Sequence, residues 1–571
     1  MPTDAPRDQT SKQTSAGRAR RLFAHGLASL VLLGLAPAAQ AADPEPPPPV
    51  LFDPIPDPVL DPFDAPFGPR VFPGPSNFPP LVLAGAGFSW DLGPRPWRAL
   101  REPRYRHRLT AGATILALMS SGFVDYWIHV DDNRTDWELS WSTPSFYRKL
   151  WTFEAVRLDA NHFETNTYSH PAAGTVTYLG ARGSGLSAGE AFLFTAAGSV
   201  LWEFVGEYRE KVSLNDLVFT PQGGFAFGEA LHQLGLFFER GEDSTTTDLL
   251  SLAFSPFRFL HHKLEGTHVP RAPVVDDLGF PADVWHRFDV SVGAAAEASS
   301  RGLGPAERRI GVTTEIINVP TYDRPGEITR SLDTGAVTGI RLVGSFGQGG
   351  LEQVDFVTRV LLGGVYDQNI VSDRRGGRYG YSFFVGPSTA FNYAKHLQSG
   401  KRQDKLGIAS PLGVHLDLTL HHGKARARAG LELYGDFAAV QSMALDEYTA
   451  KHGKEGMRLV LAEKGYYFGL GATARPTLNL SYGPVELGGQ LTYDVFESIE
   501  GLDRFQERLT NDIHLADRRS GKRAWLSYRL PMAEPRLAWI EVEHLERVGN
   551  IGRTSARHES TDVRAGITFR F

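Results

Sequence analysis

Apolar and polar residues alternate with a period of two over the second half of the chain, from about residue 285 onward. Phe288, Val290 and Val292 are separated by single polar residues, and Leu478 and Leu480 repeat the pattern later. This period is typical of β-strands whose two faces meet different surroundings. Roughly 12 such segments can be counted, several of them about 10 residues long, which is the length of a membrane-crossing strand. The pattern therefore predicts an antiparallel sheet of membrane-spanning strands.

A soluble sandwich and a transmembrane barrel are the two architectures that fit this alternation. In a sandwich the apolar face forms the core, whereas in a barrel it faces lipid and the polar face lines a lumen. Here the polar faces mix small residues with opposite charges, as a crowded lumen requires. Residues 562–571 also alternate and end on Phe571, which resembles the terminal strand that the bacterial barrel-assembly machinery recognises. We expect an α+β chain, with a helical domain at 101–280 and an antiparallel transmembrane β-barrel of roughly 12 strands at 281–571.

The connections between the predicted strands differ in length. Residues 422–423 and 483–484 read as tight turns, whereas 398–404, 443–455 and 517–522 are polar and read as loops at the cell surface. Aromatic residues near segment ends are expected to form girdles at the membrane interfaces: Tyr466, Tyr467, Tyr482, Tyr493 and Trp525.

The first 41 residues read as a signal peptide. Arginines precede a short apolar core at 26–35, and small residues follow at 39–41, where a cleavage site is expected. Residues 42–100 are rich in proline and are expected to be extended or disordered, serving as a spacer or as a tail that binds a periplasmic protein. We therefore expect export to the bacterial outer membrane, with membrane lipid as a partner.

Composition excludes some classes of site and partner. The chain has no cysteine, so it has neither disulfides nor thiolate chemistry. The formal net charge of -6 and the lack of a dense basic run argue against nucleic acid as a partner.

The helical domain contains an apolar segment that carries two acidic residues. Ser187, with Glu190 three residues later, is a capping-box pattern, so we expect a helix from Ser187 to about residue 209. Glu203 and Glu207 lie one turn apart in it and need partners or protons. A second apolar helix follows, whose glycines at 224 and 228 would let another helix approach closely.

Residues 161–229 resemble one known family. The matching positions are Asn166, His170, Pro171, Gly174, Ala181, Arg182, Gly185, Trp202, Glu203, Glu207, Ser213, Asp216, Leu217, Thr220, Pro221, Gly223, Gly224, Gly228 and Glu229. They resemble the bacterial domain-of-unknown-function family 3943, found in outer-membrane and cell-envelope proteins. The resemblance implies a location in the cell envelope, and it implies no activity, because none is established for the family.

Five titratable residues at these positions form a candidate site: His170, Glu203, Glu207, Asp216 and Glu229. As a catalytic cluster, His170 would be a base, Asp216 its orienting partner, and Glu203 or Glu207 the proton donor. The alternative is a structural network in which these groups cap helices and bond backbone amides. The serines in this stretch, Ser184, Ser187 and Ser213, lack a recognisable acyl-transfer context, so the sequence assigns no serine nucleophile.

A metal site and any cofactor are left open by the sequence. Glu229 with His232, and Asp159 with His162, have the three-residue spacing of carboxylate-bundle metal sites. Spacings this short are common, so the sequence alone predicts no metal site and leaves the cofactor unknown.

Three functions fit these patterns. In the first, the barrel serves a structural, transport or scaffolding role and the helical domain plugs or caps its periplasmic mouth. In the alternative, the helical domain is a membrane-associated enzyme that acts on lipid or cell-wall material through the candidate cluster. In the third, the proline-rich segment and the helical domain bind a periplasmic partner protein.

Overall fold

A computed structural model describes residues 107–128, 137–267, 269–300, 302–347, 350–398, 402–454, 457, 459–499, 513–532 and 535–571. The predicted signal peptide and the proline-rich segment lie outside the described residues.

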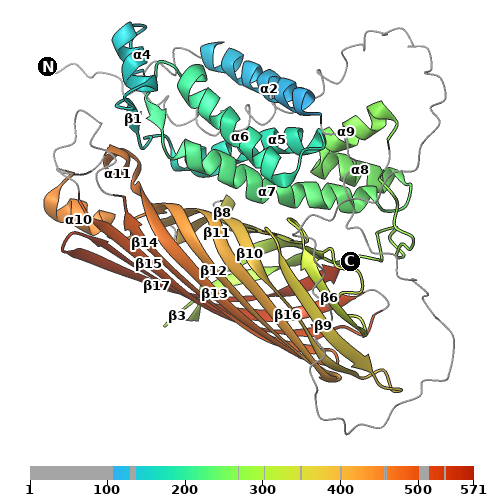
Figure 1. Cartoon of the computed structure of the whole chain (residues 1–571). Helices are drawn as coiled ribbons and strands as arrows, with labels where there is room; N and C mark the ends of the chain where they lie inside the picture. Colours follow the sequence, from blue (N-terminus) through green and yellow to red (C-terminus); the bar gives the residue numbers. More distant parts are fainter. Residues whose placement is uncertain are drawn as a thin grey trace, which may run out of the picture. The chain divides into compact units, whose positions relative to one another are not determined.

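The first described part of the chain is helical, as predicted (Figure 1). Its elements are α2 (Arg108–Ile128), α4 (Thr143–Leu150), β1 (Val156–Arg157), η3 (Thr165–Ser169), α5 (His170–Gly183), α6 (Ala188–Leu201), η4 (Trp202–Gly206), β2 (Val212–Ser213), α7 (Asp216–Glu239), α8 (Thr245–Phe254) and α9 (Pro256–Glu265). The expected capping box is present, because Ser187 and Glu190 satisfy each other's backbone amides at the start of α6. The expected single helix to residue 209 instead passes from α6 into the π-helical turn η4.

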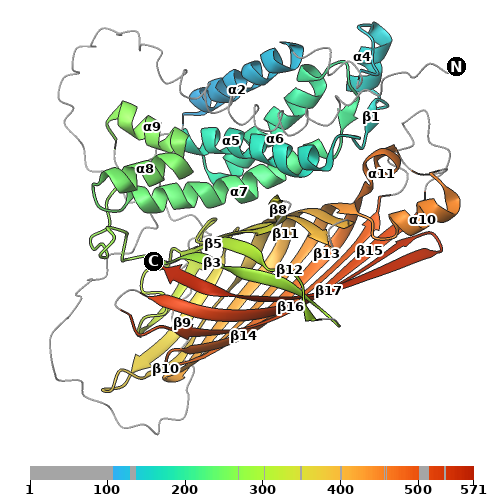
Figure 2. The same cartoon turned by 180° about the vertical axis from the view of Figure 1, so that it is seen from behind.

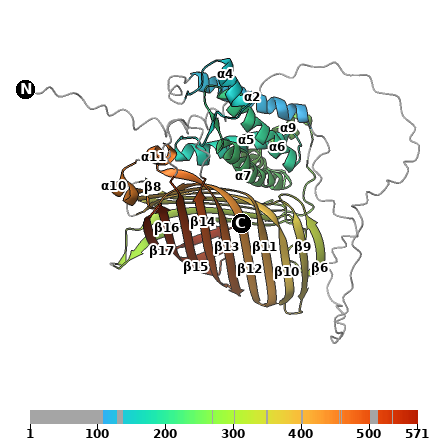
Figure 3. The same ribbon diagram turned by 60° about the vertical axis from the view of Figure 1, so that its left-hand side comes forward.

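Among the described residues of the second half, the elements are strands apart from two short helices. Its elements are β3 (Trp285–Ser299), β4 (Gly302–Leu303), β5 (Glu307–Ile317), β6 (Gly326–Leu332), β7 (Val337–Gly347), β8 (Gly350–Leu361), β9 (Gly364–Ser372), β10 (Arg378–Gln398), β11 (Arg402–Gly423), β12 (Ala425–Gln441), α10 (Leu445–His452), α11 (Leu459–Lys464), β13 (Tyr466–Tyr482), β14 (Val485–Ser498), β15 (Leu515–Arg529), β16 (Arg536–Ile551) and β17 (Thr554–Arg570). Strand β17 pairs with β3, and β10 pairs with β11, so the sheet closes on itself (Figure 3). The result is the predicted antiparallel barrel, with 12 strands.

Strands β6 and β9 prolong the barrel wall at one end. Strand β10 pairs with β9 through residues 378–385 and with β8 through residues 388–396, so β8 and β9 act as one interrupted strand. In the same way β6 pairs with β9 where β7 pairs with β8. The predicted tight turn at Gly483 is present and has a positive φ of 59°, which glycine adopts without strain.

Polar side chains from strands that are not neighbours meet inside the barrel. Arg428 on β12 forms a 2.9 Å ion pair with Glu315 on β5, and Arg475 on β13 donates a 3.1 Å hydrogen bond to Asn392 on β10. Side chains that link non-adjacent strands must cross the lumen, which fixes the inward face of each strand. The lumen is therefore polar and spanned by side chains, as the alternation predicted.

The opposite face of each strand carries the apolar residues. On β13, Arg475 points inward, so the even-numbered residues point outward, and Leu478, Leu480 and Tyr482 are all exposed there. The expectation of an apolar outer wall is confirmed. Such a surface is suited to lipid.

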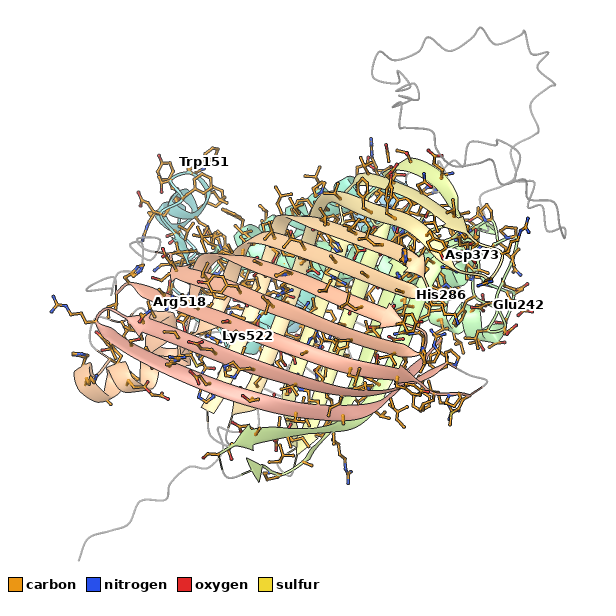
Figure 4. All side chains as sticks on the ribbon, turned by 90° about the horizontal axis from the view of Figure 1, so that it is seen from below. Trp151, Glu242, His286, Asp373, Arg518 and Lys522 are labelled. Atoms are coloured by element: carbon orange, nitrogen blue, oxygen red, sulfur yellow. The ribbon has the colours of Figure 1, made fainter. Side chains whose placement is uncertain are left out.

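The predicted surface loop at 517–522 is wrong, because these residues belong to β15. Asp517 points into the lumen, where it accepts a 3.2 Å hydrogen bond from Tyr467 on β13, two strands away. Arg518 and Lys522 lie on the other side of β15 and are exposed (Figure 4). The charges that suggested a loop are thus those of a strand with a polar lumen face.

One end of the lumen is filled by apolar side chains. Inward residues of several strands, among them Ile408, Phe496 and Leu515, form a buried cluster. Residues of the connection between β12 and β13 join this cluster, including Met457 and Leu461, the second of which lies in α11. The predicted loop at 443–455 therefore contains α10 and belongs to a connection that packs against the lumen.

Helix α7 packs against the outer wall of the barrel (Figure 2). The ring of Phe219 contacts three outward-facing rings of β10, β12 and β13, those of Phe391, Phe437 and Phe468. One strand further, the rings of Phe227 and Phe356 lie 4.8 Å apart between centroids. These outward positions follow from the inward direction of Arg359, Asn392, Arg428 and Arg475 on the same strands.

Polar contacts reinforce this packing between helices and wall. The Glu164 carboxylate pairs with Lys395 at 2.8 Å and with Lys405 at 3.0 Å. Asn166 donates a 2.9 Å hydrogen bond to the hydroxyl of Tyr466. All these contacts lie on the wall, so they give no support to the expected plug or cap at the barrel mouth.

Helix α2 lies on the side of the bundle that faces away from the strands, where it contacts α5, α6 and η4. By length and composition alone, α2 could cross a membrane, and 11% of its most apolar window is buried. Its exposed apolar residues include Leu109, Leu116, Val124 and Ile128.

Candidate functional site

A two-stranded parallel ladder brings together the two chain segments that carry the candidate site. Val156 pairs with Val212, and Arg157 pairs with Ser213. The strands are short because each leads directly into a polar turn. At the end of the ladder, the amide of Asp159 donates a 2.8 Å hydrogen bond to the side-chain carbonyl of Asn215. Asp159 and Asp216 are thereby held side by side, although 57 residues separate them in the sequence.

His170 completes this group at the junction between η3 and α5. Pro171 follows it in the first turn of α5, where proline needs no amide partner. The Nε2 atom of His170 lies 3.4 Å from a carboxylate oxygen of Asp216. One ligand atom from each of Asp159, His170 and Asp216 lies within 4.8 Å of the others.

Asp216 is held in place by its neighbours. The side-chain amide of Asn215 donates a 2.9 Å hydrogen bond to its carboxylate, and the Asp216 amide donates a 3.3 Å bond to the hydroxyl of Ser213. The Ser213 amide in turn donates a 2.8 Å bond to the Glu203 carboxylate. Glu203 therefore supports the turn that carries Asp216, in agreement with the structural alternative drawn from the sequence.

Burial dominates the electrostatics of this cluster. It raises the pKa of Glu203 and of Asp216 well above their ordinary values, and the neighbouring acidic residues add to both shifts. It also raises the pKa of Glu207 to about 7 and lowers the pKa of His170. Groups poised in this way can exchange protons near neutral pH, which is the property that acid–base chemistry needs.

Glu229 does not belong to this group, so the predicted five-residue cluster is wrong on this point. Its carboxylate accepts hydrogen bonds from Arg182 at 2.8 Å, Tyr178 at 2.7 Å and Gln233 at 2.7 Å. Burial opposes its ionisation, but Arg182 beside it holds the pKa of Glu229 below the ordinary value. Glu229 is therefore part of a satisfied ion-pair network inside the bundle.

Asp159 is a site residue that the sequence does not indicate. Its three-residue spacing points to His162, whereas its partners in the structure are His170 and Asp216. The parallel pairing of β1 with β2 is only two residues long. A stretch this short has no hydrophobic period from which the pairing could be predicted. The signal available was a group of three polar residues in a short stretch, Asp159, Asn161 and His162.

The site lies inside a region with a known family. Residues 155–257 match the family model of DUF3943, a domain of unknown function. The match extends the resemblance at 161–229 on both sides and includes Asp159. A comparison with curated proteins finds no match.

Solved structures resemble the barrel half of the chain at low identity. They include an anion-selective porin from Comamonas acidovorans, at 11% identity, 50% coverage of this chain, 99% of that chain and a TM-score of 0.19. OmpT of Vibrio cholerae follows at 8% identity, 52% and 99% coverage, and a TM-score of 0.20. OccK8 (OprE) of Pseudomonas aeruginosa has 10% identity, 51% and 98% coverage, and a TM-score of 0.16. All three are outer-membrane barrels. The barrel fold of this chain is shown independently by the pairing of its own strands.

Proposed function

We propose that this protein is an outer-membrane barrel whose main role is to hold the DUF3943-matching helical domain against its outer wall, at the level of the lipid. The barrel is then a membrane scaffold, and the helical domain carries the function. The observation that supports this most directly is the packing of Phe219 and Phe227 on outward-facing rings of the strands. This proposal replaces the plug or cap expected from the sequence.

The apolar surface of the bundle supports the same arrangement. A domain that covers part of a lipid-facing wall needs a surface of its own that lipid can cover. Leu109 and Ile128 of α2 are 91% and 70% exposed, and Leu193 and Val205 lie exposed on α6 and η4. We infer that α2 and this part of the bundle face the membrane.

The proposed location is the bacterial outer membrane, reached through the signal peptide at 1–41. Membrane lipid is the proposed partner of the apolar wall, and the barrel-assembly machinery is the proposed partner of the last strand through Phe571. Fractionation of cells into inner and outer membranes tests the location, and recovery of the chain in a fraction without membrane would contradict it.

A scaffold barrel differs from a porin in the state of its lumen. Cross-lumen pairs such as Arg428 with Glu315, together with the apolar cluster at one end, narrow the space that a diffusion channel would need. We therefore expect the purified chain to produce no stable conductance steps in planar bilayers. A porin of similar strand number provides the positive control, and steady ohmic steps from the full chain would contradict the scaffold role.

A second candidate function is supported by the buried cluster. His170, Asp216, Glu203 and Glu207 together have the proton-exchanging groups that a hydrolase or transferase of lipid or cell-wall material would use. Loss of an envelope phenotype in the variant H170A, with barrel migration on gels unchanged by comparison with wild type, would support catalysis. Equal loss of folding and phenotype would leave the cluster with a structural role.

A further inference from the structure

We propose that Asp159, His170 and Asp216 bind a divalent first-row transition-metal ion, of which Zn²⁺ and Mn²⁺ are the best matched. This inference goes beyond the scaffold role and does not depend on it. It concerns a site inside the helical bundle, which could be occupied whether or not the barrel conducts.

The geometry of the three side chains suits one shared ion. Their ligand atoms lie within 4.8 Å of one another, and ligands of one ion at bonds of about 2.1 Å lie roughly 3 to 4 Å apart. Small side-chain rotations would therefore bring two carboxylate oxygens and one imidazole nitrogen onto a common centre. Three protein ligands leave a further coordination position for water or substrate.

The imidazole of His170 is an independent sign of a missing ligand. Its Nε2 atom is buried and has no hydrogen-bond partner among the residues that the structure describes, although it lies 3.4 Å from the Asp216 carboxylate. A buried polar atom without a partner costs about 1–3 kcal/mol, so such atoms are rare unless an ion or water satisfies them. A metal bond to Nε2 would satisfy this atom.

The acidic side chains around the site are not balanced by ion pairs with lysine or arginine among the described residues. Asp159, Glu203, Glu207 and Asp216 gather in this part of the bundle, and no described lysine or arginine forms an ion pair with any of the four. The Lys149 ammonium instead donates to the backbone carbonyls of Glu207 and Glu210, at 2.8 and 2.7 Å.

The second nearby cation is also engaged elsewhere. The Arg157 guanidinium pairs with Glu138 at 3.2 Å and with Glu210 at 3.6 Å. A divalent ion would therefore balance carboxylates that the protein's own cations leave without a partner. The contrast is Glu229, whose charge is matched by Arg182 and which needs no ion.

The donor set narrows the choice of metal. One imidazole with two carboxylates suits Zn²⁺, Mn²⁺ or Fe²⁺, whereas Mg²⁺ and Ca²⁺ prefer oxygen ligands alone. The support behind the ligands resembles that of known metal sites, because Asn215 holds both the amide of Asp159 and the carboxylate of Asp216. The His170 side chain as a whole is 20% exposed, although its Nε2 atom is buried.

The test is metal binding to the full chain in detergent. Protein stripped with a chelator is titrated separately with Zn²⁺ and Mn²⁺, and bound metal is counted after gel filtration. We expect one ion per chain, with at least a tenfold loss of affinity in H170A and in the isosteric variant D216N. The matched control is H286A, because His286 also lies 3.4 Å from an aspartate, Asp276, outside the cluster.

Two results would overturn the proposal. One is wild-type protein that binds no ion at a fixed ratio, and the other is binding that H170A and D216N leave unchanged. If these variants fail to fold, as judged by migration of the unheated barrel on gels, the wild-type stoichiometry decides. Spin resonance of bound Mn²⁺ then reports whether a nitrogen ligand is present, and its absence would contradict a role for His170.

Discussion

Glu164 is a single carboxylate that joins the helical domain to the barrel wall through Lys395 and Lys405. Burial alone would raise the pKa of Glu164, but the two lysines outweigh burial and lower the pKa to about 2. The folded-state pKa is thus below the unfolded value of about 4.3, so the ionised group stabilises docking above that pH. This contribution is lost as the pH falls from about 4.3 towards 2.

We expect the thermal midpoint for release of the helical domain to fall over that pH window in the wild type. Tryptophan fluorescence can follow the release. The variant E164Q has no charge to lose, so its midpoint should change less with pH. Because Glu164 and its two lysines are partly exposed, the ion pairs should contribute on the order of 1 kcal/mol or less to the free energy of docking. Identical pH profiles for the two proteins would contradict this role.

Arg182 should matter far more to stability than an exposed arginine. It neutralises Glu229 inside the bundle, where both side chains are at least 95% buried. The variant R182M leaves a buried carboxylate without its partner, which typically costs about 3–5 kcal/mol. Arg271 pairs with Asp243 at the surface, so R271M should cost about 1 kcal/mol or less. Urea unfolding in detergent compares the two, and equal losses would contradict the assignment.

At the residue scale, the burial of these acidic side chains could be predicted from the sequence. Their contact partners could not. Glu203 lies at the end of one apolar helical segment and Asp216 at the start of another, so their burial could be inferred, and they do converge near His170. Glu229 has the same pattern but meets Arg182, and Asp159 enters the site from an irregular segment. Such choices depend on tertiary contacts that no local period records.

At the scale of elements, α5 and α7 approach each other through glycines. A Cβ on Gly174 would lie 1.9 Å from the carbonyl oxygen of Thr220, and one on Gly224 would lie 2.5 Å from the backbone of Gly174. The small-residue ridge predicted at 224 and 228 is thereby confirmed as a place of close helix contact.

The variant G174A should therefore force α5 and α7 apart and destabilise the bundle by about 1–3 kcal/mol or more. The matched control is G189A in α6, where an added Cβ would meet nothing within 4 Å. That change should be neutral or stabilising by up to about 1 kcal/mol, because alanine favours helix. Circular dichroism during thermal unfolding measures both, and a neutral G174A would contradict the close packing.

The strands were the most predictable elements, because their period of two reflects two unlike faces along their whole length. What the pattern could not supply is what covers each face. Tyr466 was expected at a membrane interface, and instead it is buried under the helical domain and bonded to Asn166. Tyr467 was expected in the same girdle and points into the lumen, where it meets Asp517.

At the scale of the whole molecule, the relation between the two halves was beyond sequence reasoning. An apolar wall meets lipid or an apolar helix equally well, so the alternation does not distinguish a covered strand from a bare one. The expected position of the helical domain was the polar mouth of the barrel, where a plug or cap would sit. The structure instead uses outward aromatic residues, such as Phe356 and Phe391, as the docking surface.

Cysteine cross-linking tests this wall docking most directly, because the chain has no cysteine of its own. Phe227 and Phe356 are in ring contact, so the pair F227C and F356C should be cross-linked in the membrane by a short bifunctional thiol reagent that spans the space left by the two rings. Val357 is the next residue on β8 and lies on the lumen side, so F227C with V357C should not. A cross-link in the first pair alone is the predicted result. No cross-link in the first pair, or one in the control pair, would contradict docking on the outer wall.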